Sequence, residues 1–190
     1  MKNSTVIHIG IDDTDSPKGM CTTFLAYKIV KFLEMNKVQF VDYPSLIRFN
    51  PNIPWKTRGN GAVRLSIKTN NPKKIKNKIT KFVDDYSETK NGANPGLVFY
   101  ENEIVTPSFH KFSELALWKL ISREKAKQFI LENKIDSFYL GNGQGLVGAI
   151  GAIGYKFSDH TFELLSYRKK SQFGKKRIIA KDSVKNMQSI

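Results

Sequence analysis

Stretches typical of β-strands alternate along this chain with stretches of helical periodicity, and this order limits the fold more than any other feature. Residues 6–11 are typical of a strand, and residues 20–35 carry apolar side chains at helical spacing. The same patterns predict strands at 38–43, 46–49, 62–69, 97–100, 136–140 and 161–167, and helices at 71–86, 113–133 and 146–153. We therefore expect a mixed α/β or α+β fold, with a domain boundary near residue 112 between two α–β layers.

Several side chains can be assigned to structural positions. Residues 62–69 alternate apolar and polar side chains, which predicts a half-buried strand. Trp118 falls in an apolar helical stretch and is expected in the core, whereas Trp55 could stack on a base. Cys21 is the single cysteine, so the chain has no disulfide framework and no cysteine-based zinc site, and we interpret it as a small packing residue. The three histidines show no metal-ligand spacing and are expected to be structural.

The charge balance favours a polyanionic partner. The chain has 190 residues, with 31 Lys and Arg against 17 Asp and Glu, a formal charge of +14. Basic residues are densest from Ser166 onward, and such a surface attracts phosphate chains, although a plain solvated surface is the alternative. No stretch reaches the roughly 20 apolar residues of a membrane span, and no secretory signal is visible, so we expect no membrane contact and a cytoplasmic location.

Three carboxylates directly follow the first predicted strand. Asp12, Asp13 and Asp15 lie within four residues, where they could hold Mg²⁺ against phosphate oxygens. The alternative is an acidic turn that caps the next helix. An EF-hand is excluded, because the twelfth position counted from Asp13 is Phe24 instead of glutamate.

The next helix begins with a segment suited to an anion. Lys18, Gly19, Thr22 and Thr23 lie near its expected N-terminus, where free N–H groups and the helix dipole favour negative charge. A threonine hydroxyl beside phosphate and carboxylates could accept a phosphoryl group. The simpler alternative is a threonine that only caps the helix.

Two glycine-containing loops could also take part in binding. In the first loop, Lys56 and Arg58 supply positive charge, and Gly59-Asn60-Gly61 would let backbone approach a phosphate, or would form a hairpin turn. In the second, residues 143–148 match G-x-G-x-x-G. Too little chain follows for a dinucleotide-binding fold, so close helix packing or a small-ligand loop is the better interpretation.

Five blocks of the sequence resemble one known family, the agmatidine synthetases (tRNA-isoleucine 2-agmatinylcytidine synthetases). The blocks are residues 9–16, 18–23, 46–62, 94–96 and 143–149. They span nearly the whole chain, and the first and third are long and specific.

The resemblance implies an α+β chain and an ATP-dependent ligase. In this family a kinase-like domain, here 1–112, precedes a ferredoxin-like domain, here 113–190. Members join agmatine to the wobble cytidine of an isoleucine tRNA with a CAU anticodon, and ATP ends as AMP. The γ-phosphate is first taken by a threonine that matches Thr22, and the cytidine oxygen is then phosphorylated before agmatine displaces it.

The resemblance and the residue chemistry together assign roles. The catalytic and Mg²⁺-binding residues would be Asp12, Asp13 and Asp15, with Thr22 as phosphate acceptor. The ATP-binding residues would be Lys18, Gly19, Thr23, Lys56, Arg58, Gly59, Asn60 and Gly61. Agmatine is a dication that needs carbonyls, carboxylates or aromatic faces, and its expected contacts are Asn94, Gly96, Asn142, Gln144 and Gly145.

The chain departs from the family pattern in one respect. Members carry an OB-fold and a zinc ribbon after these two domains, and this sequence stops about where the OB-fold would begin. We expect either a fragment, or a short member whose missing parts are supplied elsewhere. The alternatives to the ligase are a catalytically incomplete RNA-binding module, and a Mg²⁺-dependent phosphohydrolase that uses Asp13-Thr14-Asp15 as an aspartyl nucleophile motif.

Overall fold

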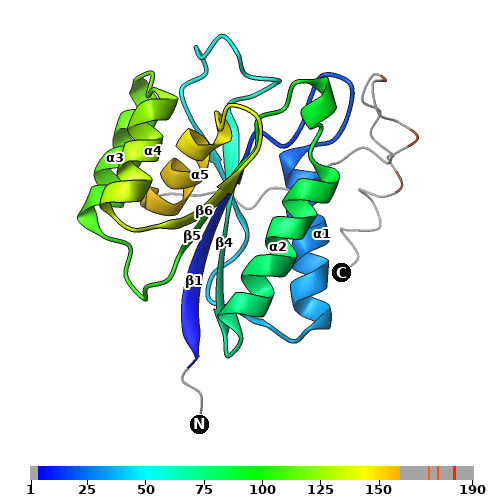
Figure 1. Ribbon diagram of the computed structural model, residues 1–190, viewed down its shortest axis with the longest axis vertical. Coiled ribbons are helices and arrows are strands. Elements are labelled where there is room, and N and C mark those ends of the chain that lie inside the picture. The colour runs from blue at the N-terminus through cyan, green and yellow to red at the C-terminus, as the bar shows by residue number, and fades with distance from the viewer. Residues whose placement is uncertain (1–3, 159–170, 172–174, 176–181, 183–190) are drawn as a thin grey trace.

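The computed structural model describes residues 4–158 together with 171, 175 and 182 (Figure 1). The predicted strand at 161–167 and most of the basic segment after Ser166 lie outside these residues. The described elements are β1 (Thr5–Asp12), α1 (Thr22–Met35), β2 (Gln39–Phe40), β3 (Ser45–Arg48), β4 (Gly61–Thr69), α2 (Pro72–Tyr86), the short 3-10 helix η1 (Thr89–Asn91), β5 (Gly96–Tyr100), α3 (Pro107–Trp118), α4 (Arg123–Glu132), β6 (Asp136–Tyr139) and α5 (Gly145–Gly154).

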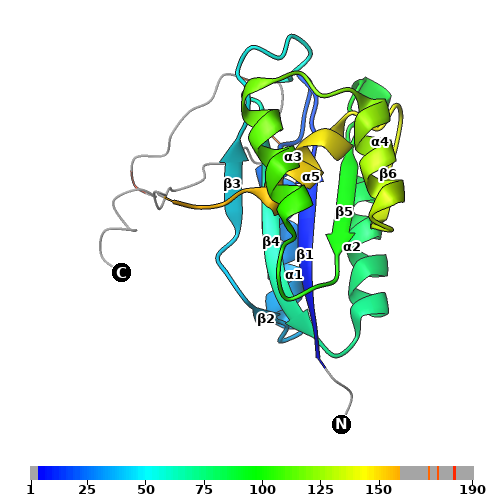
Figure 2. The ribbon, with the colours of Figure 1, turned by 90° about the vertical axis from the view of Figure 1, so that its left-hand side faces the viewer.

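One antiparallel sheet organises the described part of the chain. Its order is β2-β4-β1-β5-β6, and β3 also pairs with β4. The central strand β1 pairs with β4 on one side and β5 on the other, so that Ile9 faces Leu65 and Phe99. Helices α1 and α2 cover one face, and α3, α4 and α5 cover the other (Figures 1 and 2). Antiparallel pairing with helices on both faces confirms the α+β class.

The sheet separates two apolar cores. Ile7, Ile9 and Ile11 pack under α1 and α2. On the opposite face, Val98 packs with the apolar side chains of α3, α4 and α5, including Phe109. No helix among the described residues is long and apolar enough to cross a membrane.

Strand β4 is buried on both faces, so the prediction of a half-buried strand is wrong. Ser66 is 3% exposed and Arg64 is 8% exposed. The buried Arg64 charge is compensated, because the guanidinium pairs with the Asp42 carboxylate at 2.9 Å and donates to the Tyr155 carbonyl at 3.2 Å. Ser66 likewise bonds the His8 ring at 2.9 Å, which supports a structural role for that histidine.

The predicted helix at 113–133 is wrong in outline, because two helices occupy this region. Helix α3 starts with Pro107 at its first turn and ends at Trp118, where Lys119 is extended with φ −117° and ψ 156°. Ser122 then caps α4 by accepting from the Lys125 backbone N–H at 3.2 Å. The break leaves the Trp118 side chain 80% exposed at the helix end, so its expected core position is also wrong.

Residue 112, the expected domain boundary, lies inside α3. On its C-terminal side, β6 pairs with β5, and α5 packs against β1. The described residues before and after position 112 therefore share one sheet.

Glycines let α5 lie directly on the sheet, which confirms close helix packing at the 143–148 motif and leaves its part as a small-ligand loop a prediction. A Cβ added to Gly145 would lie closer than 3.0 Å to backbone atoms of Gly96 and Asp12. A Cβ on Gly10 would be equally close to the Ala149 carbonyl. Only glycine permits this approach of two backbones.

We expect the Gly10→Ala variant to lose stability. The added methyl meets the α5 backbone, which cannot move aside as a flexible side chain would, so the free energy of unfolding should fall by about 3 kcal/mol. That loss corresponds to a melting temperature lower by roughly 6–12 °C. In the matched variant Gly59→Ala the nearest atoms belong to the flexible Arg48 guanidinium, so the melting temperature should barely change. Equal melting temperatures for both variants would contradict the packing argument.

Candidate active site

The acidic loop between β1 and α1 has an unusual backbone. Asp12 ends β1, and the loop then returns to α1 through Asp13 and Met20, which have φ values of 52° and 61°. A left-handed conformation is uncommon for aspartate and unfavourable for a long side chain such as methionine. Conformations of this kind persist where surrounding contacts impose them, and they cluster at functional sites.

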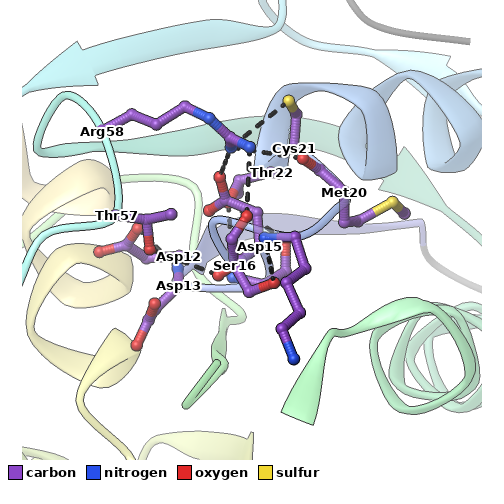
Figure 3. A network of polar contacts seen from close by, with 11 residues as sticks. Asp12, Asp13, Asp15, Ser16, Met20, Cys21, Thr22, Thr57 and Arg58 are labelled. Atoms are coloured by element: carbon purple, nitrogen blue, oxygen red, sulfur yellow. Dashed lines mark hydrogen bonds and ion pairs between the residues drawn. The ribbon is translucent and has the colours of Figure 1, made fainter. Parts of the chain in front are cut away.

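Asp15, Thr22 and Arg58 form one polar network, although they come from three separate segments (Figure 3). The Arg58 guanidinium pairs with the Asp15 carboxylate and also donates to the Ser16 carbonyl at 3.1 Å and the Met20 carbonyl at 3.3 Å. The Thr22 hydroxyl donates to Asp15 Oδ1 at 3.5 Å. Arg58 thus connects the β3–β4 loop to the segment that precedes α1.

Thr22 is the first residue of α1, yet it does not cap the helix. The N-cap position belongs to Cys21, and no side chain provides a cap hydrogen bond there. The Thr22 hydroxyl instead accepts from the Thr14 hydroxyl at 3.1 Å and from the Thr14 backbone N–H at 3.4 Å. Thr22 is 8% exposed, so its hydroxyl is held in one place beside a carboxylate and a helix N-terminus. Cys21 is buried, as its packing assignment predicts.

Asp12 and Asp13 point away from that network. The Asp12 carboxylate accepts from the Asp13 backbone N–H at 2.7 Å and lies against Gly148, where a Cβ would overlap it. The Asp13 carboxylate accepts from the Asn94 backbone N–H at 3.2 Å. Burial, followed by the neighbouring Asp13 charge, raises the pKa of Asp12 well above its usual value. Burial raises the pKa of Asp13 to about 7, against the opposing effect of the Asn94 hydrogen bond.

These carboxylates suit a cation that phosphate oxygens also bind. No ion pair joins Asp12 or Asp13 to another described residue, whereas Asp15 is paired with Arg58. Among the described residues, no group of three or more acidic, histidine or cysteine side chains is arranged to hold a metal by itself. Mg²⁺ commonly takes one or two carboxylates and completes its shell with phosphate and water. The donor set therefore fits Mg²⁺ brought with a nucleotide better than a site built from protein alone.

Stability should depend on pH through Asp13. Its folded-state pKa of about 7 lies above the unfolded value of 3.8, so the folded chain binds more protons between these values. Stability should therefore fall as pH rises from about 4 to 7, by at most ~1.4 kcal/mol per pH unit from this group. Thermal denaturation at pH 5, 6.5 and 8 should give a steeper fall for the wild type than for Asp13→Asn. Parallel curves would contradict the assignment.

A single cavity brings many of the expected residues together. Its walls include Asp12, Asp13 and Asp15 from the acidic loop, and Gln144 from the turn before α5. The β3–β4 loop contributes five expected residues: Lys56, Arg58, Gly59, Asn60 and Gly61. Carboxylates thus face a basic loop across one cavity, an arrangement able to bind a metal-bridged phosphate. Thr22 does not line this cavity, but its hydroxyl donates a hydrogen bond to Asp15, which does.

Other expected residues lie outside the cavity lining. Lys18 is exposed, Gly19 closes a turn with Ser16, and Thr23 is half-buried in the first turn of α1. Of the residues expected to bind agmatine, Asn94 and Asn142 hold two loops together, because the Asn94 side chain accepts from the Asn142 N–H at 3.0 Å.

The remaining two of these residues, Gly96 and Gly145, are in backbone contact with each other and shape the wall behind Asp12. Neither lines the cavity, and their predicted contact with agmatine stays a prediction.

One wall of the cavity is formed by residues that the sequence patterns did not indicate. Lys119, Leu120 and Ile121 line it from the α3–α4 connection, which the prediction had placed inside a continuous helix. Val147 and Gly148 line it from α5. Ser122, a good helix N-cap residue directly after this segment, was the available signal that the chain breaks there.

Comparison with known proteins places the chain in a family. Its residues 8–142 match the family model of the TiaS TCKD domain, and residues 143–190 match that of the TiaS FLD domain. The chain therefore belongs to the TiaS family, which agrees with the resemblance drawn from its motifs.

Relatives and solved structures extend this match. The tRNA-isoleucine 2-agmatinylcytidine synthetase TiaS of Cenarchaeum symbiosum (strain A) is 46% identical over 184 residues, 97% of this chain and 41% of that protein. The protein of the same name from Thermococcus sibiricus is 41% identical, over 94% of this chain and 42% of the relative. The chain thus spans less than half the length of these relatives.

Two solved structures share the fold. The crystal structure of TiaS in complex with an isoleucine tRNA and ATP matches with a TM-score of 0.84 and 32% identity, over 97% of this chain and 44% of that one. The complex of TiaS with an isoleucine tRNA, AMPCPP and agmatine matches with a TM-score of 0.82 and 30% identity, over 97% of this chain and 45% of that one.

Proposed function

We propose that this chain provides the ATP-dependent catalytic part of an agmatidine synthetase, which joins agmatine to the wobble cytidine of an isoleucine tRNA. One observation carries the proposal. The Thr22 hydroxyl is held by Asp15 at the start of α1, beside a cavity lined by two further carboxylates and a basic loop. The names of the relatives support the same activity, and the solved complexes contain an isoleucine tRNA, ATP or its analogue, and agmatine.

The first step is phosphoryl transfer to this chain. Thr22 Oγ attacks the γ-phosphorus of ATP, the bond from that phosphorus to the bridging oxygen breaks, and ADP is formed. Asp15, to which the hydroxyl donates, accepts the proton. Arg58 pairs with the same carboxylate and would bind the transferred phosphate. Asp12 and Asp13 would hold Mg²⁺, which supplies charge neutralisation on the phosphates when bound.

The later steps act on RNA. The ring oxygen of the cytidine takes the β-phosphate of the bound ADP, which leaves AMP. The amine of agmatine attacks the same carbon and forms the new C–N bond, the amine loses a proton, the C–O bond breaks, and inorganic phosphate carries the oxygen away. Hydrolysis of the phosphate on Thr22 restores the free hydroxyl. Gln144, in the cavity wall, would hydrogen-bond agmatine or the base. The two loops tied by Asn94 and Asn142 would keep Gln144 in place, because the Gln144 N–H donates to the Asn142 side chain at 2.9 Å.

A complete reaction tests the proposal. The chain is incubated with an isoleucine tRNA bearing CAU, agmatine, ATP and Mg²⁺, and the RNA is digested to nucleosides. We expect a cytidine heavier by agmatine less one water, formed only when both agmatine and ATP are present. AMP should accumulate in step with it. An unmodified cytidine, with and without a longer relative's remaining domains, would overturn the proposal.

A further inference from the structure

Both tryptophans of the chain are exposed beside the cavity. Trp55 lines it and is 53% exposed, while Trp118 ends the helix whose following residues also line the cavity and is 80% exposed. Leu120, one of these lining residues, is 57% exposed. Contiguous exposed apolar side chains mark a binding surface, whereas apolar side chains exposed singly do not.

The two tryptophans belong to one connected surface. Asn50, at the start of the β3–β4 loop, donates through its side chain to the Trp118 carbonyl at 3.2 Å, and its backbone N–H donates to the Ala116 carbonyl at 3.5 Å. The Asn60 side chain closes the same loop onto the Asn50 carbonyl at 2.9 Å. The loop that carries Trp55 is therefore fixed to the end of α3, which carries Trp118.

Positive charge accompanies these rings. Lys56 follows Trp55, and Lys119 follows Trp118, and both lysines line the cavity. Lys56 Nζ donates to the Ile53 carbonyl at 3.0 Å, and no described carboxylate forms an ion pair with either lysine. Aromatic faces beside unpaired cations are the means by which proteins hold single-stranded nucleic acid without reading its sequence. Lysine is depleted in protein–protein interfaces, so the two lysines favour a nucleic acid over a protein partner.

We propose that Trp55, Lys56, Trp118, Lys119 and Leu120 form a stacking rim that holds the unpaired nucleotides on either side of the base inserted into the cavity. The rim deepens the proposed function, on which it rests, by assigning residues that position the RNA. The two rings stack on flanking bases, and the two lysines contact the phosphates between them.

The adenine of ATP offers the same stacking chemistry as an RNA base. RNA is favoured because Trp55 belongs to the cavity lining and Trp118 lies outside it. A nucleotide whose phosphates sit at the acidic loop can cover Trp55, whereas covering both rings needs a ligand that continues beyond the cavity lining.

Because the chain has two tryptophans and both lie in the rim, their fluorescence reports on it directly. Trp118→Phe leaves Trp55 as the single emitter, and Trp55→Phe leaves Trp118. An RNA hairpin with CAU in its loop is titrated against each variant, with a fully paired duplex and ATP–Mg²⁺ as separate arms. We expect the hairpin to quench the fluorescence of both tryptophans. The duplex should quench neither tryptophan, and ATP–Mg²⁺ should quench Trp55 alone.

Affinity provides the second readout. Trp55→Ala and Trp118→Ala should each weaken hairpin binding about tenfold, as the loss of one stacked base predicts. Ile104→Ala is the matched control, since Ile104 is 75% exposed in the β5–α3 connection and absent from the cavity wall. Its affinity should equal that of the wild type.

Each other outcome overturns the rim. Quenching of both emitters by ATP, with none added by the hairpin, would assign the rings to the cofactor. Equal affinity in all three alanine variants, or self-association of the chain with no quenching by RNA, would assign the surface to something other than RNA. Phosphorylation of wild-type Thr22 is measured in parallel, with and without RNA, and its failure in both would contradict the proposed function while leaving the rim's RNA binding intact.

Discussion

Thr22→Ala should reduce the rate at which this chain forms ADP from ATP to the rate measured in buffer without protein. The variant lacks the oxygen that would attack the γ-phosphorus. The neighbouring Thr14 hydroxyl donates its own proton to Thr22 Oγ, whereas Thr22 donates to the Asp15 carboxylate. Thr22→Ser keeps the oxygen and should retain most of the activity. A coupled assay of ADP release over time compares the three proteins.

Thr89→Ala provides the control for this series, because Thr89 is exposed in η1 and absent from the cavity wall. It should match the wild type. Undiminished ADP release from Thr22→Ala, in a protein that melts at the wild-type temperature, would show that water or another residue accepts the phosphate.

Asp15→Asn should slow the same reaction about 10²- to 10³-fold, the usual contribution of a positioned proton acceptor. An asparagine keeps the shape and can still accept from Thr22, but it cannot take up the proton and no longer pairs with Arg58. The affinity for ATP should change much less than the rate, because Asp12 and Asp13 remain to hold the metal.

Asp84→Asn removes an exposed carboxylate of α2 and should leave the rate unchanged. Single-turnover measurements at saturating ATP separate the rate from binding. A rate for Asp15→Asn within a factor of about three of the wild type would contradict its role as proton acceptor, as would a large loss of ATP affinity at an unchanged rate.

Local patterns predicted most of the fold, and tertiary contacts explain where they failed. The apolar residues of β1 and the Asn71-Pro72 start of α2 were sufficient to place these elements, and Asn71 does cap its helix by accepting from the Lys74 N–H at 3.3 Å. The polar side of β4 was placed in solvent because nothing local reveals that Asp42 and the Tyr155 carbonyl would satisfy Arg64.

The site was predicted where its residues are close in sequence and missed where the fold assembles it. Asp12, Asp13 and Asp15 follow one strand, so their spacing alone indicated a site. Sequence spacing could not show that Arg58 would pair with Asp15 across 43 positions, or that Gly148 would lie against the Asp12 carboxylate. The wall at 119–121 was hidden by an apolar stretch that continues the helical pattern across the break.

The most direct test of the account is the location of the phosphate. The wild-type chain is incubated with ATP and Mg²⁺, digested, and its peptides are sequenced by tandem mass spectrometry, with a parallel acid-quenched sample treated with hydroxylamine to detect acyl phosphates. The account predicts one phosphate on Thr22, stable to hydroxylamine. A hydroxylamine-sensitive phosphate on Asp13, or a chain that binds ATP and carries no phosphate even when RNA is added, would contradict it.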